Sequence, residues 1–235
     1  MNMRAPFDLR GLAKDTLAED VGSGDITTML TIPHDLSASG EIIAKEDMVI
    51  AGLQAVRAVF KVMHGGVKVI DIKRDGDRAA SGDCIASVIG SARALLTGER
   101  VALNFLQRMC GIATLTARYV ELVAGTGARI VDTRKTTPGL RSLEKYAVTI
   151  GGGHNHRFGL FDGILIKDNH IAIAGGVAAA VQAAKQGAPH TLKIEVEVTT
   201  INQLEEAISA GADAVLLDNM SVDTLRRAVE VAADL

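Results

Sequence analysis

The sequence contains no tryptophan, and only two tyrosines and five phenylalanines among its 235 residues. An interior with so few aromatic rings has to be filled by Ala, Val, Ile and Leu, which is the usual filling of a parallel sheet covered by helices. Long apolar runs are also absent: none approaches the roughly 18 residues that a membrane-spanning helix needs, and the amino terminus has no apolar signal-peptide core. We therefore expect a soluble protein that is not exported and has no membrane partner.

Cysteine and net positive charge are scarce as well. The two cysteines, Cys84 and Cys110, have no metal-binding or redox spacing, so we expect reduced thiols in a cytoplasmic protein. The formal net charge of -3 argues against a nucleic-acid partner, because nucleic-acid-binding surfaces are basic. Between residues 128 and 170, however, seven Lys or Arg oppose four Asp or Glu. This local excess predicts a small polyanionic ligand.

Residues 1–112 predict a mixed α+β amino-terminal domain. A helix is expected over residues 7–19, and a second over 53–63 lies between strand-like runs that extend from residue 37 to residue 90. The charged residues Lys73, Arg74 and Asp75 are interpreted as a solvated turn. No cluster in this part is interpreted as catalytic.

A longer helix is predicted over residues 97–123. Thr97 is its expected N-cap, and a break or a close helix contact is expected at Gly111, because glycine is unfavourable inside a helix. Arg100 then falls in the first helical turn, where the helix dipole disfavours a cation. Solvent exposure would explain this position, but so would a ligand or a neighbouring subunit.

Residues 113–235 predict an α/β domain of alternating strands and helices. Short apolar strands are expected at residues 130–131, 163–166, 192–196 and 214–217, and the helices at 140–150, 177–186, 200–211 and 222–233. Repeated βα units require a parallel sheet. Four units do not close a barrel, so we expect a partial α/β barrel that a partner or a further carboxyl-terminal portion completes.

Charged side chains follow each of these predicted strands. They are Asp132, Thr133, Arg134 and Lys135 after the first strand, Lys167 after the second, Glu197 after the third and Asp218 after the fourth. Because the carboxyl ends of parallel strands face the ligand crevice, we expect these side chains to form one site. Arg suits a two-pronged grip on carboxylates and Lys suits point-charge contact with phosphates, so the cations imply a ligand with several negative charges.

The segment GGGHNHR at residues 151–157 is the second motif. Its three glycines are expected to expose consecutive backbone N–H groups to a phosphate or carboxylate, while His156 and Arg157 add further donors. A metal site at His154 and His156 lacks a third nearby ligand in the sequence.

The carboxylates Glu197 and Asp218 need a different role. They could bind sugar hydroxyls, coordinate Mg²⁺ or stabilise a cationic transition state. A phosphorylated sugar that loses diphosphate with Mg²⁺ would satisfy all three, whereas internal ion pairs among the strand ends are the alternative that the residues leave open.

Four segments together resemble the quinolinate phosphoribosyltransferase family. They are GERVALNFLQRMCGIAT, VDTRKTTPGLRSLEKYAVTIGGGHNHRFGLFDGILIKDNHI, EVEV and LLDNM. The resemblance implies a mixed α/β amino-terminal domain, a partial α/β barrel and a homodimer with each site at the subunit interface. It also implies the reaction, in which quinolinate and phosphoribosyl pyrophosphate give nicotinate mononucleotide, diphosphate and CO₂, with Mg²⁺, in NAD biosynthesis.

The same resemblance implies a role for each candidate residue. Thr133, Arg134, His156 and Arg157 correspond to the residues that hold the carboxylates of quinolinate, and Arg100 to a residue that reaches into the neighbouring subunit's site. Lys135 and Lys167 correspond to lysines that contact substrate and the phosphoribosyl donor, and Glu197 and Asp218 to acidic residues near the donor's ribose and Mg²⁺. We expect these last four residues to be catalytic.

Two alternative functions are retained. A related protein found with molybdate transport systems shares the architecture that the resemblance implies. Family members also continue past Asp218 through two strands whose Gly- and Ser-rich ends bind the donor's 5′-phosphate, and the sequence has no such segment before Leu235. The second alternative is therefore an inactive anion-binding or dimerisation chain.

Overall fold

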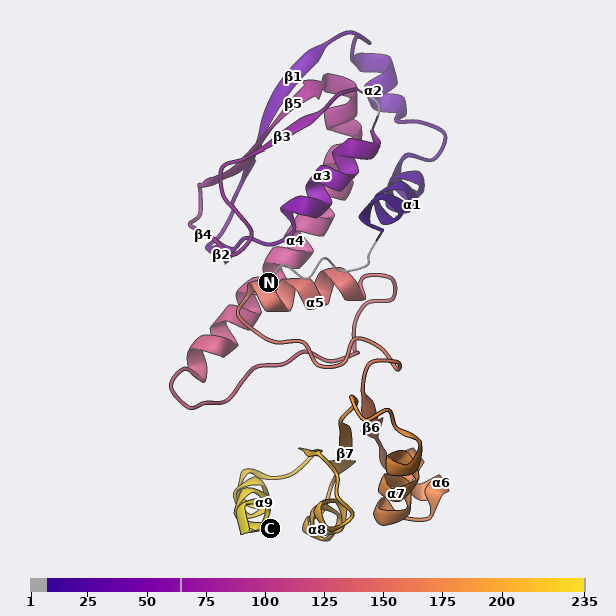
Figure 1. Cartoon of the computed structure of the whole chain (residues 1–235). Coiled ribbons are helices and arrows are strands. Elements are labelled where there is room, and N and C mark those ends of the chain that lie inside the picture. Colours follow the sequence, from indigo (N-terminus) through magenta and orange to yellow (C-terminus); the bar gives the residue numbers. More distant parts are fainter. Residues whose placement is uncertain (1–7, 64, 235) are drawn as a thin grey trace. The chain divides into compact units, whose positions relative to one another are not determined.

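The computed structural model describes residues 8–63 and 65–234, and the chain divides into two compact units, Met1–His156 and Arg157–Leu235 (Figure 1). The domain boundary expected between residues 112 and 113 lies inside a helix of the first unit. Within the described residues, none of the helices combines the length and apolar character that a membrane crossing requires.

The first unit is a mixed α+β structure. Its helices are α1 (Leu9–Val21), α2 (Ile26–Thr31), α3 (Leu53–Val62), α4 (Ala92–Leu122) and α5 (Arg141–Ile150), and its strands are β1 (Ser37–Ile43), β2 (Met48–Val49), β3 (Lys68–Asp71), β4 (Arg78–Ala79) and β5 (Cys84–Ser91). Strands β1, β5 and β3 form an antiparallel sheet in that order, and β2 pairs with β4. The expected helix in residues 7–19 is α1, although Phe7 lies outside the described residues.

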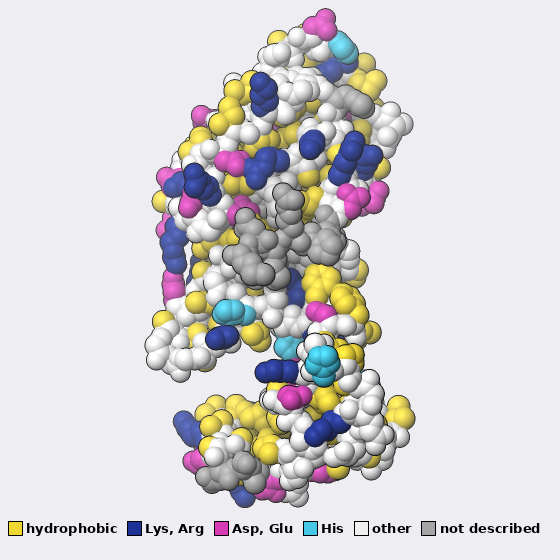
Figure 2. Space-filling view, in the orientation of Figure 1, with side chains coloured by type: hydrophobic (Ala, Val, Ile, Leu, Met, Phe, Trp, Pro, Cys, Tyr) yellow, Lys and Arg dark blue, Asp and Glu magenta, His cyan; other side chains and the backbone are white. Residues whose placement is uncertain are grey.

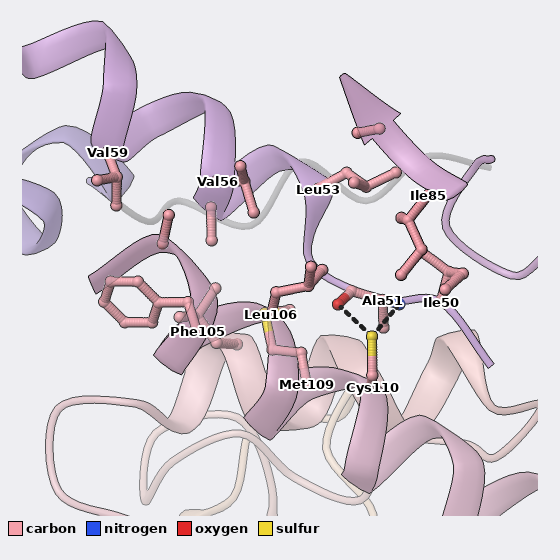
Figure 3. Close-up of a cluster of buried hydrophobic side chains, with 14 of the residues drawn as sticks. Ile50, Ala51, Leu53, Val56, Val59, Ile85, Phe105, Leu106, Met109 and Cys110 are labelled. Atoms are coloured by element: carbon pink, nitrogen blue, oxygen red, sulfur yellow. Dashed lines mark hydrogen bonds between the residues drawn. The ribbon is translucent and has the colours of Figure 1, made fainter. Parts of the chain in front are cut away.

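The core of the first unit lies where α3 and α4 pack together (Figure 3). Val56 and Val59 of α3 meet Phe105 and Met109 of α4, and all four are buried. Cys110 lies beside them, and its sulfur accepts a hydrogen bond from the backbone N–H of Ala51 at 3.3 Å. Burial raises the pKa of the Cys110 thiol to about 11, so this cysteine is a neutral core residue.

The amino end of α3 is held by Asp75. The Asp75 carboxylate accepts hydrogen bonds from the backbone N–H groups of Gly52 and Leu53, each at 3.1 Å, and from the hydroxyl of Tyr146 at 2.7 Å. The interpretation of this charged segment as a solvated turn was therefore wrong for Asp75, which caps a helix from another part of the chain.

Helix α4 is a single unbroken helix that starts five residues earlier than expected. Ser91 caps it, and the Thr97 hydroxyl instead donates to the Asp25 carboxylate at 3.1 Å. Gly111 causes neither a break nor a close contact, since a Cβ built there would meet nothing within 4 Å. Glycine costs only about 1 kcal/mol in a helix, which the buried face of α4 outweighs. Arg100 is therefore inside the helix and exposed, not in its first turn.

The strand expected at residues 130–131 is absent. Val131 forms one isolated bridge with His154, and Val131 is 52% exposed rather than buried. The segment opposite, residues 151–155, is the turn that leaves α5, so it offers a single pairing position and no ladder can extend.

The second unit is a parallel sheet with helices, which confirms the prediction of a partial α/β barrel. Its elements are β6 (Ile164–Ile166), α6 (Asp168–Ala174), α7 (Val177–Gly187), β7 (Ile194–Val198), α8 (Ile201–Ser209), β8 (Ala214–Leu217) and α9 (Val222–Asp234). The strand order is β6-β7-β8, and helices α7, α8 and α9 pack in chain order (Figure 1). Alternate residues Ile194, Val196 and Val198 of β7 are buried at 4% exposure or less, so one face of the strand is the core.

Candidate functional site

The first cluster of candidate residues lies on the loop of residues 132–137, which enters helix α5. Two adjacent residues of α5 hold the ends of this loop. Lys145 makes an ion pair with Asp132 at the beginning, and the Glu144 carboxylate accepts the backbone N–H of Thr137 at 3.1 Å at the end. Inside the loop, the Thr133 hydroxyl accepts the backbone N–H of Lys135 at 3.0 Å. The conformation of the loop is thus fixed at both ends and in its middle.

The ion pair of Asp132 and Lys145 is buried, with side-chain exposures of 7% and 3%. Asp132 accepts two further hydrogen bonds, from the backbone N–H of His156 at 2.9 Å and from the side-chain amide of Asn155. These bonds satisfy a carboxylate that would be costly to bury alone. They also tie the loop of residues 132–137 to the segment that carries His156.

Glu144 is the second buried charge of α5. The Arg108 Nε donates to its carboxylate at 2.7 Å, and its side chain is only 10% exposed. Burial by itself would raise the pKa of Glu144, but the hydrogen bonds from Arg108 and Thr137 outweigh that effect and hold the pKa below its usual range. Sequence reasoning did not identify Glu144 or Lys145. The available signal was that these two charged residues lie next to the apolar Leu143 and close to Ala147, both of which are buried in α5.

Arg134 is the cation of this loop that sequence reasoning selected and that has an unsatisfied donor in the described structure. The Arg134 Nε is buried and has no hydrogen-bond partner within the described part of the chain. An unpaired buried donor is costly, so its geometry suits an acceptor supplied by a ligand. Lys135 and Thr133 are exposed on either side of Arg134. We call Thr133, Arg134, Lys135 and His156 the loop cluster.

The three glycines of residues 151–153 do not have the role that was expected. Their N–H groups donate to carbonyl groups of α5, namely Ala147, Thr149 and Val148, at 3.0 to 3.1 Å. They end the helix, so they cannot offer a row of donors to an anion. The glycines permit close packing instead, because a Cβ at position 153 would lie 2.8 Å from a methyl group of Val148 and 2.9 Å from one of Thr116.

The second cluster is set by the sheet of the second unit. Ile166 pairs with Val196, and Glu197 pairs with Leu216, so Lys167 and Glu197 lie next to each other and Asp218 is two residues beyond Leu216. Side chains alternate along a strand, which places all three charged groups on the face opposite the core. The Lys167 Nζ lies 2.6 Å from the Glu197 Oε2, with side-chain exposures of 42% and 16%. We call Lys167, Glu197 and Asp218 the strand cluster.

Glu197 differs from its predicted position. It lies inside β7, which continues to Val198, and does not follow the end of the strand. Its ion pair with Lys167 is an internal ion pair of the kind that sequence reasoning left open as an alternative. Asp218 follows β8 as predicted, and its carboxylate accepts the side-chain amide of Asn219 at 2.8 Å. Asn219 has a φ of +52°, the one positive value of a non-glycine residue in the described chain.

Two other candidates lie outside both clusters. The Arg157 Nη1 donates to the backbone carbonyl of Gly163 at 3.0 Å, which fixes the arginine to the entry of β6. Arg100 lies on the exposed side of α4. Elsewhere on the first unit, the visible face in Figure 2 has basic and acidic side chains intermingled. Lys73 and Asp83 of this unit form an ion pair at 2.7 Å.

Glu197 and Asp218 are the residues that could hold Mg²⁺. Mg²⁺ commonly binds one or two carboxylates together with substrate phosphates and water. Glu197 and Asp218, on one face of the sheet, can provide these two carboxylates. The described residues contain no group of three or more His, Cys, Asp or Glu side chains placed to hold a metal by themselves.

Comparisons with known proteins cover both parts of the chain. Residues 25–110 match the model of the quinolinate phosphoribosyl transferase N-terminal domain, and residues 112–235 match the model of the C-terminal domain. The chain is 49% identical to the probable nicotinate-nucleotide pyrophosphorylase [carboxylating] of Bacillus subtilis (strain 168), over 94% of this chain and 76% of that protein. It is 44% identical to the nicotinate-nucleotide pyrophosphorylase [carboxylating] of Mycobacterium leprae, over 93% and 79%.

Solved structures give the same result. The crystal structure of NadC from Streptococcus pyogenes is similar with a TM-score of 0.92 and 45% sequence identity, over 99% of this chain and 82% of that one. A NadC deletion mutant is similar with a TM-score of 0.93 and 46% identity, over 99% and 83%.

Proposed function

This chain belongs to the quinolinate phosphoribosyltransferase family, and from that premise we propose how its two charged clusters serve the family's reaction. The reaction joins quinolinate to the phosphoribosyl group of phosphoribosyl pyrophosphate, releases diphosphate and CO₂, and gives nicotinate mononucleotide for NAD biosynthesis. The observation that carries the proposal is the buried Nε of Arg134, which has no acceptor within the described residues. Quinolinate has two carboxylates, and either one can supply the missing hydrogen-bond acceptor.

The loop cluster holds quinolinate in this proposal. Arg134 binds one carboxylate through its planar guanidinium group, and Thr133, Lys135 and His156 complete the contacts, together with Arg157. The burial of Asp132 against Lys145 supports this role, because the negative charge nearest to Arg134 in the sequence is already neutralised. The cations of the loop remain available for an anionic substrate.

The strand cluster serves the phosphoribosyl donor. Departure of diphosphate leaves positive charge at the anomeric carbon, and the carboxylates of Glu197 and Asp218 stabilise that charge while Lys167 contacts the donor. Mg²⁺, when bound, would neutralise part of the charge on the diphosphate group. Glu197 and Asp218 would be its protein ligands, since they are the carboxylates that share one face of the sheet.

The decarboxylation follows from the same bond formation. Attack by the pyridine nitrogen on the anomeric carbon gives the ring a positive charge, and this charge stabilises the carbanion that forms as the adjacent carboxyl group leaves as CO₂. The protein mainly positions two polyanions that repel each other in water. Lys135 and Lys167 contribute by lowering that repulsion.

Assembly and location are further parts of the proposal. The active form is a homodimer in which Arg100 serves the neighbouring subunit's site, and the exposure of Arg100 on α4 supports this role. The location is cytoplasmic, which is supported by two free cysteines, Cys84 and Cys110, in the described structure.

The test is a turnover assay with the purified chain. Quinolinate, phosphoribosyl pyrophosphate and Mg²⁺ should yield CO₂ and nicotinate mononucleotide in equal amounts. Thermal-shift binding with quinolinate, nicotinate and molybdate is the matched comparison, and quinolinate should be the ligand that stabilises the protein. Stabilisation by molybdate would favour the transport-associated alternative, and quinolinate binding without product would favour an inactive anion-binding chain.

A further inference from the structure

Asp132 carries a buried charge at the start of the loop that is proposed to hold quinolinate. Asp132 directly precedes Thr133, Arg134 and Lys135, which are to hold an anion, and its side chain is only 7% exposed. Opposite charges attract strongly where water is excluded. A carboxylate in this place, if left unpaired, would compete with the substrate for the cations of the loop.

Lys145 is the partner of this carboxylate in the structure. Its ammonium group pairs with Asp132, and its side chain is 3% exposed, so it is buried away from solvent and from any exposed ligand position. The backbone carbonyl of Lys145 also accepts the side-chain amide of Asn155 at 3.0 Å, and Asn155 in turn donates to Asp132. The three residues form one closed set of contacts under the loop.

We infer that Lys145 is a positioning residue for quinolinate binding, because it neutralises Asp132 and thereby leaves Arg134 and Lys135 free to hold the substrate. This inference rests on the proposed function. Its distinctive consequence is electrostatic: when Lys145 loses its charge, the harm comes from the negative charge left on Asp132, so removing that charge as well should repair binding.

The experiment compares three variants with the wild-type protein. Lys145→Met removes the ammonium group but keeps an unbranched side chain. Asp132→Asn removes the charge and keeps the shape and one acceptor oxygen, which can still accept the backbone N–H of His156. The double variant combines the two changes. The quinolinate Kd is measured by calorimetry, and KM and kcat for both substrates by steady-state kinetics. Lys73→Met is the matched control, because it breaks another Lys–Asp pair of the first unit, that with Asp83.

The expected result is selective for one substrate. Lys145→Met should raise the Kd and KM for quinolinate about tenfold and change the KM for phosphoribosyl pyrophosphate less than about twofold, in the range of coupling between contacting charges. The double variant should bind quinolinate within about threefold of the wild type, because two neutral groups can replace a buried ion pair without loss. Lys73→Met should leave both KM values unchanged.

Two results would overturn the inference. One is a double variant that binds quinolinate as poorly as Lys145→Met, since a purely structural role gives no repair. The other is an equal rise in KM for both substrates. If Lys145→Met does not fold, the quinolinate Kd of the double variant is compared with that of the wild type, and a difference of more than about threefold overturns the inference. Absence of quinolinate binding by the wild-type protein would instead reject the proposed function, which separates the two failures.

Discussion

The two charged clusters place their side chains by different means. The loop cluster depends on side chains, because two buried residues of α5, Glu144 and Lys145, hold the ends of residues 132–137. The strand cluster depends on backbone pairing, because the register of β6, β7 and β8 alone puts its charged groups on one face. Replacing one side chain should therefore disturb the geometry of the loop cluster, whereas in the strand cluster it should change only the chemistry of the replaced group.

Arg134→Ala should give the largest effect. It removes the guanidinium group whose Nε is buried without a partner, so quinolinate binding should weaken about 100-fold, as expected for the loss of charge-assisted hydrogen bonds. Calorimetry measures the Kd, and circular dichroism checks that the fold is retained. Arg118→Ala, which alters an exposed residue of α4, is the control and should bind normally. An unchanged Kd for Arg134→Ala would remove this residue from the site.

Glu197→Gln should mainly affect the chemical step. The amide keeps the size of the side chain but cannot stabilise positive charge at the anomeric carbon, so kcat should fall about 10- to 100-fold. The KM for quinolinate should change less than about twofold, since the backbone register holds the strand cluster in place. Steady-state kinetics with Glu205→Gln, an exposed position on α8, as the control measures the difference. A rise in KM at constant kcat would show that Glu197 only binds.

Glu144→Gln tests the support of the loop and has a pH signature. The pKa of Glu144 is lowered in the folded protein, so its contribution to stability is present above its unfolded pKa of about 4.3 and is lost as the pH falls through the lower folded pKa. The free energy of unfolding of the variant should be about 2 kcal/mol lower at pH 7, because the neutral amide is a weaker acceptor for Arg108 than the carboxylate. Urea unfolding at pH 7 and at a series of lower pH values measures this difference. A difference that does not shrink as the pH falls would contradict the prediction.

Tyr146→Phe should have the smallest effect, and it should change only the stability of the fold. The Tyr146 hydroxyl donates to Asp75 at 2.7 Å, and Asp75 keeps its bonds to the amino end of α3 without it. The free energy of unfolding should fall by about 1 kcal/mol, with unchanged KM for both substrates. Tyr119→Phe, at a residue that is 53% exposed, is the control. A change in the KM for quinolinate would contradict the prediction and would show that the contact of Tyr146 with Asp75 affects the loop cluster.

Local sequence patterns predicted the elements of the fold well. The strand expected at residues 214–217 is β8, and the helices expected at 53–63 and 177–186 are α3 and α7 with ends shifted by one residue. Ser221 caps α9 as expected. These elements carry their periodicity and their end signals within one short stretch, which is why sequence reasoning finds them.

Contacts between distant residues were the part that sequence could not supply. Thr97 has the right chemistry for an N-cap, but Asp25 binds its hydroxyl and the helix begins earlier. Residues 130–131 have strand-forming side chains, but no strand lies opposite to receive them. Lys145 was hidden for the same reason, because its partner Asp132 lies thirteen positions away across a turn. Each outcome depends on which neighbour the fold brings close, and a single sequence does not record that.

The alternation along β7 makes the strand sensitive to its length. Val196 and Val198 face α7 and α8, and Glu197 faces away from them. Deleting one residue before Glu197 would exchange the two sides of the strand, so that the carboxylate would enter the apolar core and a valine would take the position beside Lys167. Related sequences should therefore vary freely in which aliphatic residues they use here, yet show no insertions or deletions within these five positions.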